Sequence, residues 1–291
     1  MWDHEVEVLC VGGLIGALAS AVVAADEGVD VLVATSATEE GWPADRVEDD
    51  ETRAYFAALT DGLAADPRPT ADVPVRLVRP LTAAERRRSP PFYGARLKKW
   101  TEQCLHSPYG LMHTRVSDWP ITIMRTLENR PVQVKTVGRI ALPAEGGPVP
   151  LATWLDSEAR IRDIDVEFDT RLQRMVFEED AVIGAVLQTG RGPYAVRARH
   201  GITLAPYVGH VGHTVADPVQ GDDEAEVALV SEIGSRFARV ELLAAAPTAV
   251  TQPATCASSN GKLPKATRES RRNRGEPSRS RETDGHPPFG Q

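Results

Sequence analysis

Residues 6–34 read VEVLCVGGLIGALASAVVAADEGVDVLVA, and this stretch decides the fold. Its first six residues are mostly apolar and rich in β-branched side chains, which predicts a buried strand. Gly12 and Gly13 follow, and an alanine-rich stretch closed by Gly28 predicts a helix. A second apolar run over 29–34 predicts another strand. This order of strand, glycine turn, helix and strand is typical of a βαβ unit.

The glycine turn has the chemistry of a phosphate-binding loop. A helix N-terminus presents free N–H groups and the positive end of the helix dipole, and glycine lets the backbone approach a ligand closely. The usual pattern is G-x-G-x-x-G, whereas residues 11–16 read VGGLIG. Either Val11 stands where the first glycine should be, or one residue is missing after Gly13. Thr35 stands where an acidic residue at the end of the second strand would bind a ribose. The sequence therefore predicts either a nucleotide site or an ordinary βαβ unit with a glycine turn.

A second group of elements is predicted later in the chain. Residues 151–160 have a helical pattern, and short apolar runs at 166–168 and 172–177 predict strands. Runs at 182–188 and 194–198 pair across the turn GRGP and form a β-meander with the strand before them. After His200 and Gly201, residues 202–205 predict a last buried strand.

Together, VEVLCVGGLIGALASAVVAADEGVDVLVA and DAVIGAVLQTGRGPYAVRARHGITLA resemble the FAD-binding fold of a known group of flavoproteins. These are the flavoprotein subunits of fumarate reductase and succinate dehydrogenase, and the 3-ketosteroid dehydrogenases. The resemblance covers about residues 1–35 and 150–206, and loosely the predicted helix at 49–59. It implies FAD as cofactor and hydride transfer between the flavin and a small organic substrate, steroid-like or dicarboxylate-like.

The resemblance also implies which residues bind the cofactor, but it assigns no catalytic residue. Gly12, Gly13 and Gly16 correspond to the pyrophosphate loop, Thr35 to the ribose-binding acid, and Leu172 to a backbone contact with adenine. Proline and tyrosine replace the Thr-Gly of the family's A-T-G-G, which removes a backbone N–H. The implied cofactor-binding residues are Gly12, Gly13, Leu14, Gly16, Ala34, Thr35, Leu172, Ala205 and Pro206.

We therefore expect an α/β, Rossmann-like FAD/NAD(P)-binding fold with a β-meander, an irregular middle insertion and a disordered C-terminal tail. The FAD-binding-like domain spans 1–243. It comprises the βαβ unit (1–35), the insertion (36–148), a return segment (149–206) and a short helical end (207–243). Residues 244–291 lack apolar periodicity and cannot bury enough apolar surface to offset their ordering entropy, so they are assigned to the tail.

Composition narrows the class of protein. The chain has 291 residues, of which 42% are hydrophobic, and a formal net charge of -8, which argues against bulk nucleic-acid binding. No apolar run reaches the roughly 18–20 residues of a membrane span, and the N-terminus lacks a signal-peptide pattern. We expect a cytoplasmic protein with a small-molecule substrate and no membrane or nucleic-acid partner. A homo-oligomer remains open.

No metal site is predicted from the histidines, because His106, His113, His210 and His213 match no zinc spacing. Two other functions stay open beside the flavoenzyme. One is a non-catalytic relative that binds a nucleotide weakly or acts through protein contacts. The other is an NAD(P)-binding module, which the late meander disfavours.

Overall fold

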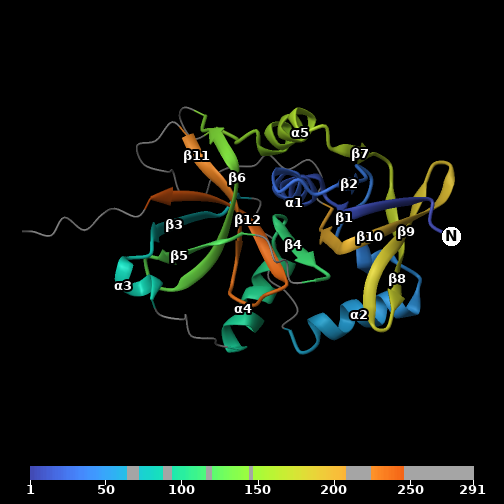
Figure 1. Ribbon diagram of the computed structural model, residues 1–291, viewed down its shortest axis with the longest axis horizontal. Coiled ribbons are helices and arrows are strands. Elements are labelled where there is room, and N and C mark those ends of the chain that lie inside the picture. The colour runs from blue at the N-terminus through green and yellow to red at the C-terminus, as the bar shows by residue number, and fades with distance from the viewer. Residues whose placement is uncertain (64–71, 88–93, 116–119, 144–146, 208–223, 246–291) are drawn as a thin grey trace, which may run out of the picture. The chain divides into compact units, whose positions relative to one another are not determined.

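The structure is a computed structural model, and it describes residues 1–63, 72–87, 94–115, 120–143, 147–207 and 224–245 (Figure 1). All the described residues belong to one compact unit. The predicted disordered tail lies outside the described residues, apart from its first two positions, which end a strand. No helix in the described part of the chain is both long and apolar enough to span a membrane.

The predicted βαβ unit is confirmed. Strand β1 (His4–Gly12), helix α1 (Leu14–Asp26) and strand β2 (Val31–Ala34) follow one another, and the two strands pair in parallel. Strand β10 (Gly192–Ala205) pairs in parallel with the other side of β1, and β7 (Asp165–Glu167) pairs in parallel with β2. The carboxyl ends of these strands therefore lie at one edge of the sheet, where ligands bind in open α/β folds.

Helix α1 packs closely on this sheet because its buried side chains are mostly small. All ten residues from Ile15 to Ala24 are buried, and the Ser20 hydroxyl lies 3.0 Å from the hydroxyl of Thr203 on β10. Helix α5 (Leu151–Ile161), which was predicted over 151–160, lies beside α1 and shares its hydrophobic core (Figure 1).

The opposite face of the sheet is covered by the meander of β8 (Arg171–Glu178), β9 (Ala181–Thr189) and the first half of β10. Helix α2 (Asp50–Thr60) confirms the helix predicted at 49–59, and its Thr52 hydroxyl accepts a hydrogen bond from the Met175 amide on β8. The predicted break between strands 194–198 and 202–205 is wrong. Strand β10 continues through this region because Gly201 (φ +110°) and a shift in register against β1 absorb the irregularity.

The predicted irregular insertion is also wrong, because 36–148 contains much regular structure. It holds the short helices η1 (Pro43–Arg46) and α3 (Ala83–Arg86), helix α4 (Gly94–Leu105) and strands β3 (Val75–Pro80), β4 (Gly110–His113), β5 (Thr122–Thr126) and β6 (Pro131–Ala141). Strands β3, β5 and β6 join β11 (Glu224–Ser231) and β12 (Phe237–Ala245) in a closed ring, because β12 pairs with both β11 and β3. Strand β4 links this ring to β10.

The helical end predicted within 207–243 is a further error, since these residues form the hairpin β11–β12 where the structure describes them. Every residue from Glu226 to Ser231 pairs with β12, and the same strand pairs with β6 on its other side. Gly234 has a φ of +79° in the turn between the two strands. Partners from distant parts of the chain thus override the local helical preference of this segment.

A buried cluster of charged side chains joins β3 to β12, the parallel pair of strands that closes the ring. The Glu241 side chain on β12 is fully buried, and its carboxylate accepts hydrogen bonds from Arg76 on β3 (2.5 and 2.8 Å). Arg239 donates to the same carboxylate at 2.8 Å, and both guanidinium groups lie over the ring of Trp100, at 5.6 and 5.3 Å from its centroid. Removing one partner would leave buried charge without compensation, so this group fixes β3 against β12.

Candidate functional site

The glycine turn between β1 and α1 is packed against the chain's own backbone. Gly12 has a φ of +126°, and a Cβ placed on it would lie 1.8 Å from the carbonyl oxygen of Ala205. A Cβ on Gly13 would lie 1.9 Å from the carbonyl oxygen of Pro206. The Gly13 amide donates a hydrogen bond of 3.1 Å to the Ala205 carbonyl. Close packing within the chain therefore explains why glycine is needed at both positions, without any ligand.

The N-terminus of α1 keeps the properties of an anion site. None of the described residues accepts a hydrogen bond from the amides of Leu14, Ile15 or Gly16. The N-cap residue Gly13 has no side chain to bond them, and the first turn contains no acidic residue. These amides and the helix dipole favour a negatively charged group.

A backbone bridge runs beside this turn. The Gly41 amide donates to the Tyr207 carbonyl at 3.0 Å, and the Tyr207 amide donates to the Gly41 carbonyl at 2.7 Å. Because β1 lies between β2 and β10, the segments that follow β2 and β10 meet beyond the end of β1. Tyr207 lies against the glycine turn, since its Cα would be 3.2 Å from a Cβ on Gly13.

A cavity of about 310 Å³ lies at the same edge of the sheet. Its walls come from the segment after β2, from the start of β8 and from Tyr207, which follows β10. The volume is at the lower end of the range for small-molecule pockets, about 300–1,000 Å³. The lining residues are Glu39, Pro43, Arg46, Val47, Glu48, Asp49, Arg171, Leu172, Gln173, Arg174, Gln188 and Tyr207.

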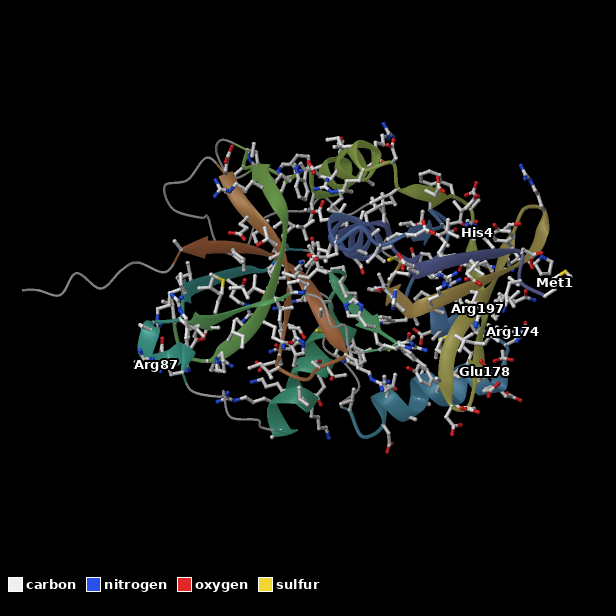
Figure 2. All side chains as sticks on the ribbon, viewed as in Figure 1. Met1, His4, Arg87, Arg174, Glu178 and Arg197 are labelled. Carbon is white, nitrogen blue, oxygen red and sulfur yellow. The ribbon has the colours of Figure 1, made fainter. Side chains whose placement is uncertain are left out.

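The cavity carries three guanidinium groups and three carboxylates, but they are not equally engaged. Glu39 lies 3.1 Å from Arg46 and 3.6 Å from Arg171. Asp49 caps α2 by accepting bonds from the Thr52 amide (2.8 Å) and hydroxyl (2.6 Å), and these bonds, with nearby arginines, lower its pKa. The side chain of Arg174 makes no ion pair within the described part of the chain; Figure 2 shows it on the meander.

Tyr207 contributes a buried polar group to this cavity. Only 4% of the residue is exposed, and its hydroxyl proton has no acceptor among the described residues. Burial is the main cause that raises the pKa of Tyr207; the charge of Glu39 acts in the same direction, while Arg171 and the Leu172 backbone oppose it. The phenol therefore stays protonated at neutral pH and can donate a hydrogen bond.

The structure brings most of the expected cofactor-binding residues to this edge of the sheet, but only Leu172 lines the cavity. Thr35 is 4% exposed, and its backbone is occupied: its amide donates to the Glu167 carbonyl, and its carbonyl accepts from the Thr170 amide. The residues that meet at the glycine turn are Gly12, Gly13, Leu14, Gly16, Ala205 and Pro206. Ala34, the last residue of β2, is buried beside Val11.

Sequence reasoning missed the contribution of Arg171, Arg174 and Tyr207 to a pocket. The one available signal was the tyrosine that replaces the glycine of A-T-G-G, since a large side chain there must occupy the site itself. His113 lies 2.9 Å from the Thr203 hydroxyl, and burial lowers its pKa to about 4. No group of three metal-ligating side chains occurs among the described residues, and His210 and His213 lie outside them.

No protein-family model matches the sequence, and none of the curated proteins matches it. Among solved structures, the chain is similar to the 3-ketosteroid-Δ4-(5α)-dehydrogenase from Rhodococcus jostii in complex with 4-androstene-3,17-dione. The identity is 16% and the TM-score 0.31, over 69% of this chain and 46% of that one. It is also similar to a flavocytochrome c3 fumarate reductase, at 16% identity and a TM-score of 0.33, over 68% of this chain and 33% of the other.

A third similar structure is that of aklavinone-11 hydroxylase with FAD and aklavinone. Here the identity is 21% and the TM-score 0.26, over 68% of this chain and 32% of the hydroxylase. The chain thus spans less than half the length of each of these three proteins. These are weak structural resemblances to FAD-dependent oxidoreductases.

Proposed function

We propose that the chain binds an adenine dinucleotide of the FAD type at the carboxyl edge of β1, β2 and β10. One observation carries the proposal: the amides of Leu14, Ile15 and Gly16 are free of described partners at a helix N-terminus without acidic side chains. A polar cavity lies at the same edge of the sheet. Together they provide a place for phosphates and a place for the sugar and base beside them.

The residues fit one half of FAD better than the whole molecule. The α1 amides suit a pyrophosphate, and a cavity of about 310 Å³ has room for the adenosine half, with Leu172 in its wall. Bound FAD would supply hydride transfer to or from a small organic substrate. The chain's described residues would bind and orient the adenosine diphosphate half, and we assign none of them to proton transfer.

A second candidate is a nucleotide-binding module without redox activity. It is favoured by the segment that follows β10, where Pro206 has no N–H to donate. The carbonyl of Pro206 fills the space above Gly13, and Tyr207 is bonded to Gly41. This backbone lies on the side of the glycine turn where β10 ends.

The two candidates are separated by a spectrum and a titration. Purified protein should show flavin absorption, or should bind added FAD with a stoichiometry near one. Binding of ADP with no binding of FAD would favour the module over the flavoprotein. Failure to bind either ligand would reject both.

A further inference from the structure

We infer that Tyr207 is a ligand-recognition residue, and that with Arg171 and Arg174 it binds the phosphorylated sugar of the nucleotide in the cavity. This inference rests on the proposed function, because it assigns a role to one end of the proposed ligand. It concerns residues of this chain that stand outside the glycine pattern. Tyr207 occupies the position of a glycine in the resembling family, so the pattern itself predicts no side chain there.

The first support is the hydroxyl of Tyr207. It lines the cavity, it is buried, and its proton has no acceptor among the described residues. Buried hydroxyls are nearly always hydrogen-bonded, because leaving one unpaired is costly. Burial raises the pKa of Tyr207, so the group offers a proton and not a negative charge. A ligand oxygen that accepts this proton would satisfy it.

The second support is the state of the arginines. Arg174 has no ion-pair partner in the described part of the chain, and Arg171 lies 3.6 Å from Glu39, which is also paired with Arg46 at 3.1 Å. Guanidinium groups bind phosphate oxygens through charge-assisted hydrogen bonds. An uncharged or cationic ligand would not compensate the positive charge of these groups.

The third support is the position of Tyr207 between the two parts of the site. Its backbone lies against Gly13 at the glycine turn, while its side chain reaches the cavity. A sugar phosphate in the cavity would therefore lie close to the N-terminus of α1. One continuous ligand can then contact both the α1 amides and the cavity.

The experiment measures binding of ribose 5-phosphate and of FAD by calorimetry, and unfolding of the free protein, in the full chain. Tyr207→Phe should lower the affinity for ribose 5-phosphate about tenfold, as expected for a lost bond to a charged group. It should also raise the denaturation midpoint, since it removes an unpaired buried hydroxyl. If Tyr207 had only a structural role, Tyr207→Phe would not lower the affinity for the ligand while raising the denaturation midpoint.

Tyr55→Phe is the matched control. The Tyr55 hydroxyl donates to the Thr114 carbonyl at 3.4 Å, accepts from Arg236 at 3.2 Å, and lies outside the cavity. This variant should lower the midpoint and leave both affinities unchanged. Arg174→Gln should weaken ribose 5-phosphate binding and reduce its dependence on salt.

Four outcomes distinguish the inference from the proposed function. If both ligands bind and Tyr207→Phe weakens both, the inference and the function are supported. If FAD binds equally well to the unaltered protein and to Tyr207→Phe, the inference about Tyr207 is overturned and the proposed nucleotide binding stands. If only ribose 5-phosphate binds, and depends on Tyr207, the inference stands without a flavin. If neither ligand binds the unaltered protein, both fail.

Discussion

The glycine turn and the cavity lie at the same edge of the sheet, yet they differ in what they contact. At the turn, Gly12 and Gly13 approach the backbone of Ala205 and Pro206 so closely that no side chain would fit. In the cavity, Arg174 makes no ion pair with a described residue, although its charge acts on Asp49, and the Tyr207 hydroxyl has no acceptor among the described residues. The glycines of the recognisable motif are thus explained by packing, whereas the region without a motif has polar side chains that packing leaves unused.

This difference shows what a glycine pattern can and cannot indicate. Glycine is required wherever two backbones approach, and the second backbone need not belong to a ligand-binding loop. A buried hydroxyl without an acceptor in the chain is not explained by packing, because buried hydroxyls are nearly always hydrogen-bonded. The next experiments should therefore test the turn by stability and the cavity by binding.

The largest effect is expected at Gly12. Gly12→Ala places a Cβ 1.8 Å from the Ala205 carbonyl oxygen in a residue with a φ of +126°. We expect a loss of more than about 4 kcal/mol, enough to prevent folding of many domains. Circular dichroism and denaturant unfolding would measure it.

Gly28→Ala is the control for Gly12. Gly28 also has a positive φ, +74°, but a Cβ there meets nothing within 4 Å. It should cost only about 1–2 kcal/mol, the usual penalty for a side chain in the left-handed region. Equal, small losses in the two variants would show that the turn is not held by close packing.

The second prediction concerns the contact between α1 and the sheet. A Cβ on Gly16 would lie 2.6 Å from the Cβ of Ala205, so Gly16→Ala should destabilise the protein by about 1–3 kcal/mol through overpacking. Gly94→Ala, at the start of α4 with nothing within 4 Å, should be neutral or slightly stabilising. A stabilising effect of Gly16→Ala would contradict this account of the turn.

The fold at the turn could be predicted because its signals are local. Strand β1, helix α1 and strand β2 are adjacent in sequence, so hydrophobic periodicity and the glycines were sufficient to identify them. The ring could not be predicted in the same way. Its closure pairs Leu242 with Val75, and the Arg76–Glu241 group spans the same distance in sequence. Partners so far apart leave no local pattern, and the described residues of 207–243 that were expected to be helical form strands β11 and β12.

The candidate site also has one part that the sequence predicts and one that it does not. Residues 12–16 of the glycine turn are contiguous and could be named from the sequence. The cavity is assembled from 39–49, 171–174, Gln188 and Tyr207, and only the fold brings these together. Leu172 was predicted through a family resemblance, whereas Arg174 follows it by two residues and carried no signal of its own.

The third prediction tests the cavity through Asp49, which both caps α2 and faces Arg174. Asp49→Ala removes the bonds to Thr52 and should cost about 1 kcal/mol. Asp49→Asn keeps a good N-cap and should leave stability nearly unchanged. Both variants remove a negative charge near Arg174, so both should bind ribose 5-phosphate more tightly. Weaker binding by Asp49→Asn would show that the Asp49 carboxylate contacts the sugar phosphate and does not merely repel it.

The smallest effect at neutral pH is expected beneath the glycine turn, at His113. Its ring lies 2.9 Å from the hydroxyl of Thr203, which in turn lies 3.0 Å from Ser20 on α1. Burial lowers the pKa of His113 from 6.5 to about 4, so the unfolded chain takes up a proton at a higher pH than the folded one. Stability should therefore be unaffected above pH 7 and fall as the pH drops from about 6.5 towards 4.

Between pH 6.5 and 5 this loss should reach roughly 1.5 kcal/mol. His113→Asn retains a polar group near Thr203 but cannot titrate, so its stability should change less over this interval. Denaturant unfolding of both proteins at pH 7, 6, 5.5 and 5 would measure the difference, with carboxylates titrating mainly below this range. Parallel curves would show that His113 is protonated as readily in the folded protein as in the unfolded chain. The contacts among His113, Thr203 and Ser20 would then be open to water, and α1 would pack less closely on β10 than the structure shows.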